Sequence, residues 1–252
     1  MVNIRIAVTN ASTVLTDKQV QQPLPALQTQ IHRDFAPVWG IDADLTFVPS
    51  DTKPPKGYWW VVVLDDSDEA GALGYHDLTD EGLPLGKVFA GTDKLLGLSW
   101  TVTASHEILE MLADPNINLM AYVQNGMEIL LFSYEVCDPC EKDELGYKIN
   151  GTMVSDFVYP AWFESFWKKD ETQFDFRKKI HNPFDILPGG YIGVFDVSYG
   201  NGWYQSSPDK KFLKYEERPR VGSRRERRRT PRKEWIKSGL KMSMIKKMKK
   251  SA

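Results

Sequence analysis

The apolar stretch from Leu95 to Leu112 constrains the fold of this chain more than any other segment. It has the length of a helix and is apolar on nearly all sides, which is typical of a helix buried at the centre of a domain. Asp114-Pro115 ends the predicted helix, because a residue before proline avoids the helical conformation. The same stretch contains Ser105-His106-Glu107-Ile108-Leu109-Glu110, and buried acids are rare unless they are paired or bound to a metal.

The spacing of this motif suits a metal site. On a helix, His106 and Glu110 lie about 40° apart around the axis, so both can bind one ion. Glu107 lies about 100° from His106, where a general base for a metal-bound water belongs. Asp114 is about 80° from His106 and could reach the same region. The spacing alone also occurs by chance on solvated helices, so the prediction depends on the apolar context.

Further acids follow the predicted strand at 128–136. Glu135 and Asp138 lie close together in the sequence, and either could supply a third ligand. One imidazole with two or three carboxylates makes a harder site than a histidine-rich one. We therefore expect a divalent metal, with zinc preferred and with iron, manganese or calcium as alternatives.

Two other candidate residues or motifs are weaker. Cys137 and Cys140 are spaced as C-x-x-C, but a four-thiolate zinc site needs a second pair and the chain has none. We expect both thiols to be reduced and not redox-catalytic. His76 could line a cleft, but a hydrogen-bonded loop histidine is the preferred interpretation.

The remaining pattern predicts an α+β (mixed α/β) fold. Strands are expected at 4–8, 43–49, 58–64 and 84–90. The strand at 58–64 should be central and buried, and the strand at 84–90 should lie at an edge. Residues 71–76 are expected to form a short strand or bend, and residues 20–39 a helix. The second half is β-rich, with strands at 128–136, 190–197 and 203–205, a hairpin at 147–154 turning at Asn-Gly, and a short helix within 156–168. The predicted body covers 1–217, with subdomains 1–115 and 116–217, and a basic C-terminal arm covers 218–252.

The arm has a charge opposite to that of the body. From Arg218 onward the chain holds 15 of its 32 lysines and arginines but two of its 34 acids, a net charge of +13 that leaves −15 on the rest. Such an arm predicts binding to nucleic acid, to a neighbouring subunit or another acidic partner, or to the acidic body of the chain itself. Its candidate contact residues are Arg224, Arg225, Arg227, Arg228, Arg229, Arg232, Lys246 and Lys247.

Membrane and secretory signals are not expected. No run approaches the roughly 18 apolar residues that span a bilayer. The start, Met1-Val2-Asn3-Ile4-Arg5, lacks the apolar region of a signal peptide, which predicts a cytoplasmic or virion location.

The motif residues also carry a resemblance. Ser105-His106-Glu107-x-x-Glu110-x-x-x-Asp114-Pro115, followed by Glu135-Val136-Cys137-Asp138-Pro139-Cys140, resembles the pattern of a zincin-like group of bacterial and phage proteins. The resemblance extends through 151–163, 189–191 and 223–225, and so covers most of the chain. It implies a zincin-like sheet around the motif helix, with His106, Glu110, Glu135 and Asp138 gathered at a metal and Glu107 as catalytic acid/base. Glu110 replaces the second histidine of the related peptidases, a departure that concerns peptidase activity more than the fold.

Two functions follow as expectations. The preferred one is a structural or assembly protein of a phage-type particle, associated with capsid, neck or tail, whose arm binds a neighbouring subunit or nucleic acid. The alternative is an active metal-dependent peptidase, with His106 and Glu110 as ligands and Glu107 as general base.

Overall fold

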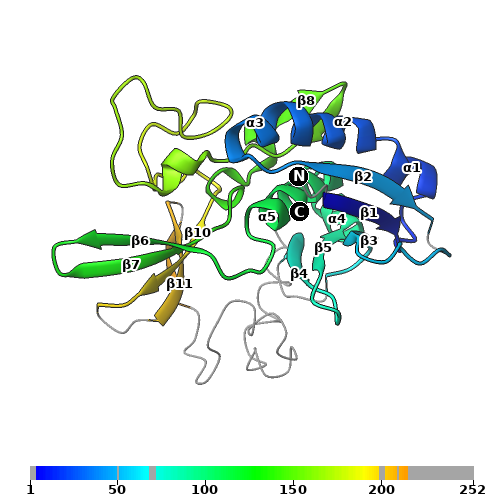
Figure 1. Cartoon of the computed structure of the whole chain (residues 1–252), viewed down its shortest axis with the longest axis horizontal. Helices are drawn as coiled ribbons and strands as arrows, with labels where there is room; N and C mark the ends of the chain where they lie inside the picture. Colours follow the sequence, from blue (N-terminus) through cyan, green and yellow to red (C-terminus); the bar gives the residue numbers. More distant parts are fainter. Residues whose placement is uncertain (1–3, 50, 68–71, 199–201, 209, 215–252) are drawn as a thin grey trace.

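The computed structural model describes residues 4–49, 51–67, 72–198, 202–208 and 210–214, and it has the expected α+β architecture (Figure 1). The first sheet has the strand order β2-β1-β3-β5-β4. Its strands are β1 (Ile4–Asn10), β2 (Ala43–Val48), β3 (Trp59–Leu64), β4 (Gly74–Leu78) and β5 (Pro84–Phe89). The first four strands of that order are parallel, and β4 pairs antiparallel with β5.

The prediction of a central strand at 58–64 is confirmed, because β3 lies between β1 and β5. Its burial alternates, however: Val61 and Val63 are fully buried and their neighbours only partly so. The edge position predicted for 84–90 is wrong, since β4 occupies the edge. Pro84 fits an inner strand because it is the first residue of β5, where a missing amide hydrogen does not interrupt the ladder.

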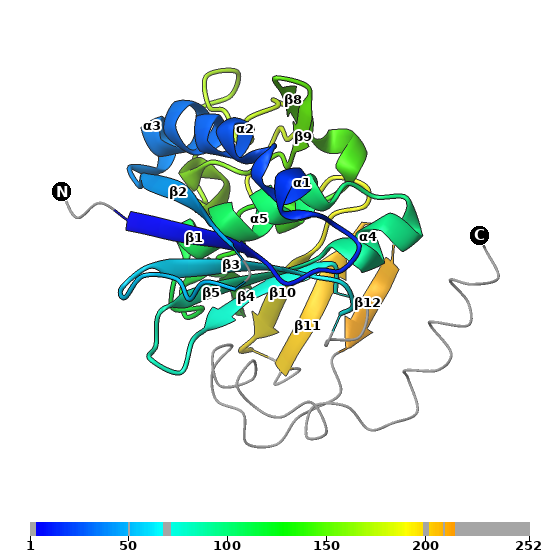
Figure 2. The ribbon, with the colours of Figure 1, turned by 90° about the vertical axis from the view of Figure 1, so that its right-hand side faces the viewer.

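Helices α1 to α3 lie over one face of this sheet, on the same side as α5 (Figure 2). The helix predicted at 20–39 is divided into α1 (Asp17–Gln21), α2 (Leu24–Thr29), a π-helical segment (Gln30–Phe35) and α3 (Ala36–Trp39). α1 begins at a capping box between Thr16 and Gln19. It ends before Pro23, which has no amide hydrogen with which to continue the helix.

The helix predicted from Leu95 to Leu112 is two helices, α4 (Ala90–Leu96) and α5 (Trp100–Ala113). Gly97 separates them in the left-handed conformation, with φ of 73°, which ends α4. Leu95 is 77% exposed, so the expectation of burial fails for α4. It holds for α5, which is buried from Thr101 to Ala113 and packs on β5, β4 and β9. Asp114 caps the end of α5, as Asp114-Pro115 predicts.

The second half contains an antiparallel sheet of order β12-β11-β10-β7-β6. Its strands are β6 (Met120–Asn125), β7 (Glu128–Ser133), β10 (Ile192–Asp196), β11 (Gly202–Ser207) and β12 (Lys210–Lys214). Strand β6 was not predicted. It forms with β7 a hairpin that projects from the body (Figure 1), and Gly126 supplies the positive φ of its turn.

A small hairpin, β8 (Tyr147–Ile149) and β9 (Thr152–Val154), packs on α5. Its Asn-Gly turn is confirmed by positive φ angles of 49° at Asn150 and 85° at Gly151. Single 3-10 turns lie at Asp138–Cys140, Asp143–Leu145 and Pro160–Phe163. The last of these is the helical structure found within 156–168.

One apolar core joins the two halves. It contains Phe35 and Leu109 from the first half and Phe157 and Trp162 from the second. A buried polar link reinforces it: the Tyr147 hydroxyl donates to Asp34 at 2.8 Å, and the Ser155 amide donates to Ser105 Oγ at 2.6 Å. The hairpin and the start of the motif are thereby fixed to each other.

The basic arm at 218–252 and its candidate contact residues lie outside the described residues. In the part of the chain that the structure describes, no helix combines the length and the apolar character needed to cross a membrane.

Candidate metal centre

The motif side chains of α5 converge as their spacing predicts. His106 Nε2 lies 3.2 Å from Glu110 Oε2, one helical turn further on. His106 is 7% exposed and Glu110 3%, so this pair lies in the interior of the protein.

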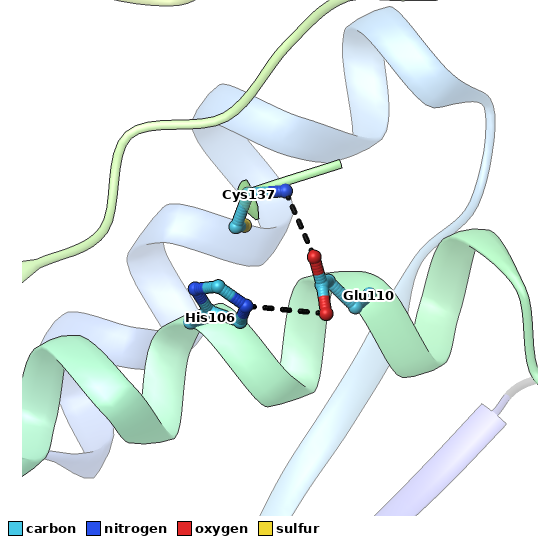
Figure 3. Close-up of side chains that lie close together, drawn as sticks. All are labelled: His106, Glu110 and Cys137. Atoms are coloured by element: carbon cyan, nitrogen blue, oxygen red, sulfur yellow. Dashed lines mark hydrogen bonds and ion pairs between the residues drawn. The ribbon is translucent and has the colours of Figure 1, made fainter. Parts of the chain in front are cut away.

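The segment after β7 closes over this pair. The backbone amides of Cys137 and Asp138 donate to Glu110 Oε1 at 3.1 and 3.3 Å, and Figure 3 shows Glu110 held between the Cys137 amide and His106. Asp138 Oδ1 lies 3.3 Å from His106 Nε2. Of the two acids considered for a third ligand, Asp138 is therefore the one beside His106.

His76 was assigned too little weight from the sequence, and the loop position preferred for it is wrong. It lies in strand β4, is fully buried and faces α5. Its Nδ1 lies 3.8 Å from Glu107 Oε2 and 3.9 Å from Glu110 Oε2, and its Nε2 lies 3.8 Å from Glu135 Oε2. The signal was the alternation of the strand, which places His76 on the same inward face as Leu78.

Glu107 is enclosed by two glycines of the sheet. A Cβ at Gly74 would lie 2.7 Å from Glu107 Oε1 and 2.8 Å from the Lys87 carbonyl, and one at Gly86 would lie 3.6 Å from Glu107 Cβ. The absence of a side chain on β4 and β5 thus makes room for this carboxylate against the sheet. The role of general base expected for Glu107 stays a prediction.

Asp114 has a different partner from the one expected. Its two carboxylate oxygens accept hydrogen bonds of 3.0 Å from the amides of Asn118 and Leu119. It therefore stabilises the turn after α5. We leave it out of the proposed ligand set.

The electrostatics of His106 follow from two acids. Burial alone would lower the pKa of His106, but Glu110 and Asp138 outweigh it and hold the pKa well above its usual value. Burial likewise opposes ionisation of Glu110, yet His106 lowers the pKa of Glu110 to about 2. Burial and the Glu110 charge raise the pKa of Asp138 to about 6. Glu110 and Asp138 therefore stabilise a positive charge at the position of His106.

Both cysteines are buried free thiols, in agreement with the expectation that they are reduced. Burial raises the pKa of the Cys137 thiol well above its usual value. Cys137 was not predicted as a ligand, but its sulfur belongs to one of two groups that could hold a metal ion.

Among the residues that the structure describes, these groups are His106, Glu110 and Cys137, and His76, Glu107 and Glu110. Within each group the ligand atoms lie within 4.8 Å of one another. The donors are imidazole nitrogen, carboxylate oxygen and thiol sulfur, which are the ligands of zinc and iron sites in proteins. The protein thus has buried groups that could hold a metal ion.

Comparison with protein-family models, with curated proteins and with solved structures gives no match to this chain. The zincin-like resemblance therefore stays a prediction from the motif.

Proposed function

We propose that the protein binds a divalent metal ion in its interior through His106, Glu110 and Asp138, with the Cys137 sulfur as a further donor. The observation that supports this proposal is the chemistry of one enclosed cluster of acids and histidines. Glu107, Glu110, Glu135 and Asp138 surround His76 and His106, and none of the six residues is more than 7% exposed. Four carboxyl groups and two imidazoles thus share one enclosed space, and buried acids are rare unless they are paired or bound to a metal.

The donor set favours zinc or iron over calcium and magnesium. Calcium and magnesium take oxygen ligands almost entirely, whereas this cluster places an imidazole nitrogen at its centre. A thiol within reach of His106 and Glu110 adds a soft donor, which suits zinc and iron. Zinc remains the metal that we expect.

The proposed role of the ion is structural. Catalytic zinc sites keep an open position for water or substrate, whereas structural sites are closed. The low exposure of every candidate ligand supports a closed site that ties α5, β4 and the 135–138 segment together. A structural ion is compatible with the preferred expectation, a structural or assembly protein of a phage-type particle, because that role needs no catalysis at the site. The phage setting and the partners of the arm rest on the motif resemblance and on the charge of 218–252. Peptidase activity stays a prediction of the resemblance.

Thermal unfolding with and without a chelator tests the proposal. A ligand present at 1,000 times its Kd stabilises a folded protein by about 4 kcal/mol, which for a domain of this size is a Tm shift of about 10 °C. We therefore expect the Tm of zinc-loaded protein to fall by about that amount in EDTA. Glu110→Gln should lower the Tm in zinc and abolish the response to EDTA, because it removes the charge that faces both imidazoles.

Asp93→Asn is the matched control. Asp93 is also a buried acid, on α4, and it accepts a hydrogen bond from Thr103 of α5 at 3.1 Å. It belongs to neither ligand group, so the control variant should keep the full EDTA response. An unchanged wild-type Tm in EDTA, with zinc supplied beforehand, would refute the proposal.

A further inference from the structure

We propose that the interior cluster holds two divalent ions and that Glu110 bridges them. The first ion would be the one proposed above, beside His106 and Glu110, and the second would be held by His76, Glu107 and Glu110. This inference rests on the proposed metal-binding function and concerns the number of ions and the ligands of the second.

The first argument is the separation of the two imidazoles. Zinc binds nitrogen and oxygen at about 2.1 Å, so two ligands of one ion lie at most about 4.2 Å apart. In the described residues, the ligand groups within a 4.8 Å limit place His106 in one group and His76 in the other. One ion therefore does not reach both imidazoles in this arrangement, and each histidine has its own set of acids.

The second argument is the position of Glu110, the member common to both groups. Its Oε2 lies 3.2 Å from His106 Nε2 and 3.9 Å from His76 Nδ1. Ligands at tetrahedral angles around one ion are about 3.4 Å apart, so both separations suit two ligands that share an ion. Oε1 is fixed by the amides of Cys137 and Asp138. A single oxygen thus faces both positions, as in sites whose two ions lie about 4 Å apart.

The third argument is the arrangement of the acids around His76. Glu107 and Glu135 each place an Oε2 atom 3.8 Å from a different nitrogen of His76. The Glu107 side chain is confined by Gly74, where a Cβ would collide with it. An ion binds one nitrogen of an imidazole ring. Glu107 and Glu110 both face Nδ1 and can share an ion with it, whereas Glu135 faces Nε2, where it can orient the ring. Helix α5 and strand β4 therefore direct three donors to one buried point.

Titration of the metal-free full-length protein with Co²⁺, followed by visible absorption and by metal analysis after gel filtration, tests the inference. We expect saturation at two ions per chain. His76→Ala and Glu107→Gln should each reduce this to one ion per chain while the His106 ion remains. His32→Ala is the matched control: His32 pairs with Asp42 in a half-exposed position away from the cluster, and its loss should leave two ions.

The outcomes separate the two proposals. Saturation of the wild-type protein at one ion per chain would overturn the bridged pair and leave the proposed metal-binding function in place. No bound ion would overturn both. If His76→Ala does not fold, Glu107→Gln and the wild-type stoichiometry still decide, and two ions retained in Glu107→Gln would contradict the assignment of Glu107 to the second ion.

Discussion

At the scale of single residues, Asp156 shows how the interior treats an acid outside the metal centre. It is fully buried, and its Oδ1 accepts hydrogen bonds from the amides of Phe157 at 2.9 Å and Arg177 at 3.2 Å. Burial, with the nearby Asp175, raises its pKa to about 8. In the folded protein this carboxyl group is therefore protonated at neutral pH.

This proton predicts a pH dependence of stability. The unfolded chain releases it with a pKa of about 3.9, so between about pH 4 and pH 8 the folded state binds the extra proton and stability falls as the pH rises. Asp156→Asn should flatten this decline by up to about 1.4 kcal/mol per pH unit, because the amide stays neutral. Urea unfolding of the wild type and of Asp156→Asn, in EDTA and at several pH values from 5 to 8, measures how the stability of each protein changes with pH. Equal slopes for the two proteins would show that Asp156 is not the cause.

The sequence predicted the site residues whose positions depend on local helix geometry, but not the one whose position depends on strand pairing. His106 and Glu110 meet because four residues are one turn of α5. His76 reaches the same site only because β4 pairs with β5 so that His76 stands opposite Gly86. That register depends on the pairing of the whole sheet. The short strand or bend predicted at 71–76 contained His76 but did not specify the residue that it pairs with.

At the scale of elements, strands β4 and β5 determine how closely α5 approaches the sheet. Gly74 and Gly86 both lie under Glu107, but they differ in the space around them. A Cβ at Gly74 would meet the Lys87 carbonyl at 2.8 Å as well as Glu107, whereas the nearest atom at Gly86 is a Val61 methyl at 3.4 Å.

Gly74→Ala should therefore displace Glu107 or β4 and weaken binding of the second ion, beside His76 and Glu107, by about tenfold or more, while Gly86→Ala should be tolerated as a matched control in the adjacent strand. A tenfold change corresponds to about 1.4 kcal/mol, which is modest for overpacking in a core. Competition for zinc with a colorimetric chelator measures both affinities. Equal affinities for the two variants would contradict the close packing described for Gly74.

Element boundaries were predicted where a residue imposes them directly. Asp114 ends α5, and Asn150-Gly151 turns the small hairpin. The break between α4 and α5 was missed, because a single glycine in an apolar run is compatible with a continuous helix. Gly97 ends α4 here by adopting a positive φ.

At the scale of the whole molecule, the candidate centre lies where the two halves meet. α5 and β4 belong to the first half, while Glu135, Cys137 and Asp138 follow β7 of the second. An ion held by both sets would reinforce the apolar core that already joins the two halves. The sequence indicated that Glu135 or Asp138 could join His106 and Glu110, but it did not indicate which acid lies beside His106, because that contact depends on the complete tertiary structure.

Metal analysis of the full-length protein, purified without chelator, incubated with Zn²⁺ and passed through gel filtration, tests the central claim most directly. We predict at least one tightly held zinc ion per chain, two if Glu110 bridges a pair, and loss of the ion in Glu110→Gln but not in Asp93→Asn. Less than about a tenth of an ion per folded wild-type chain would contradict the account.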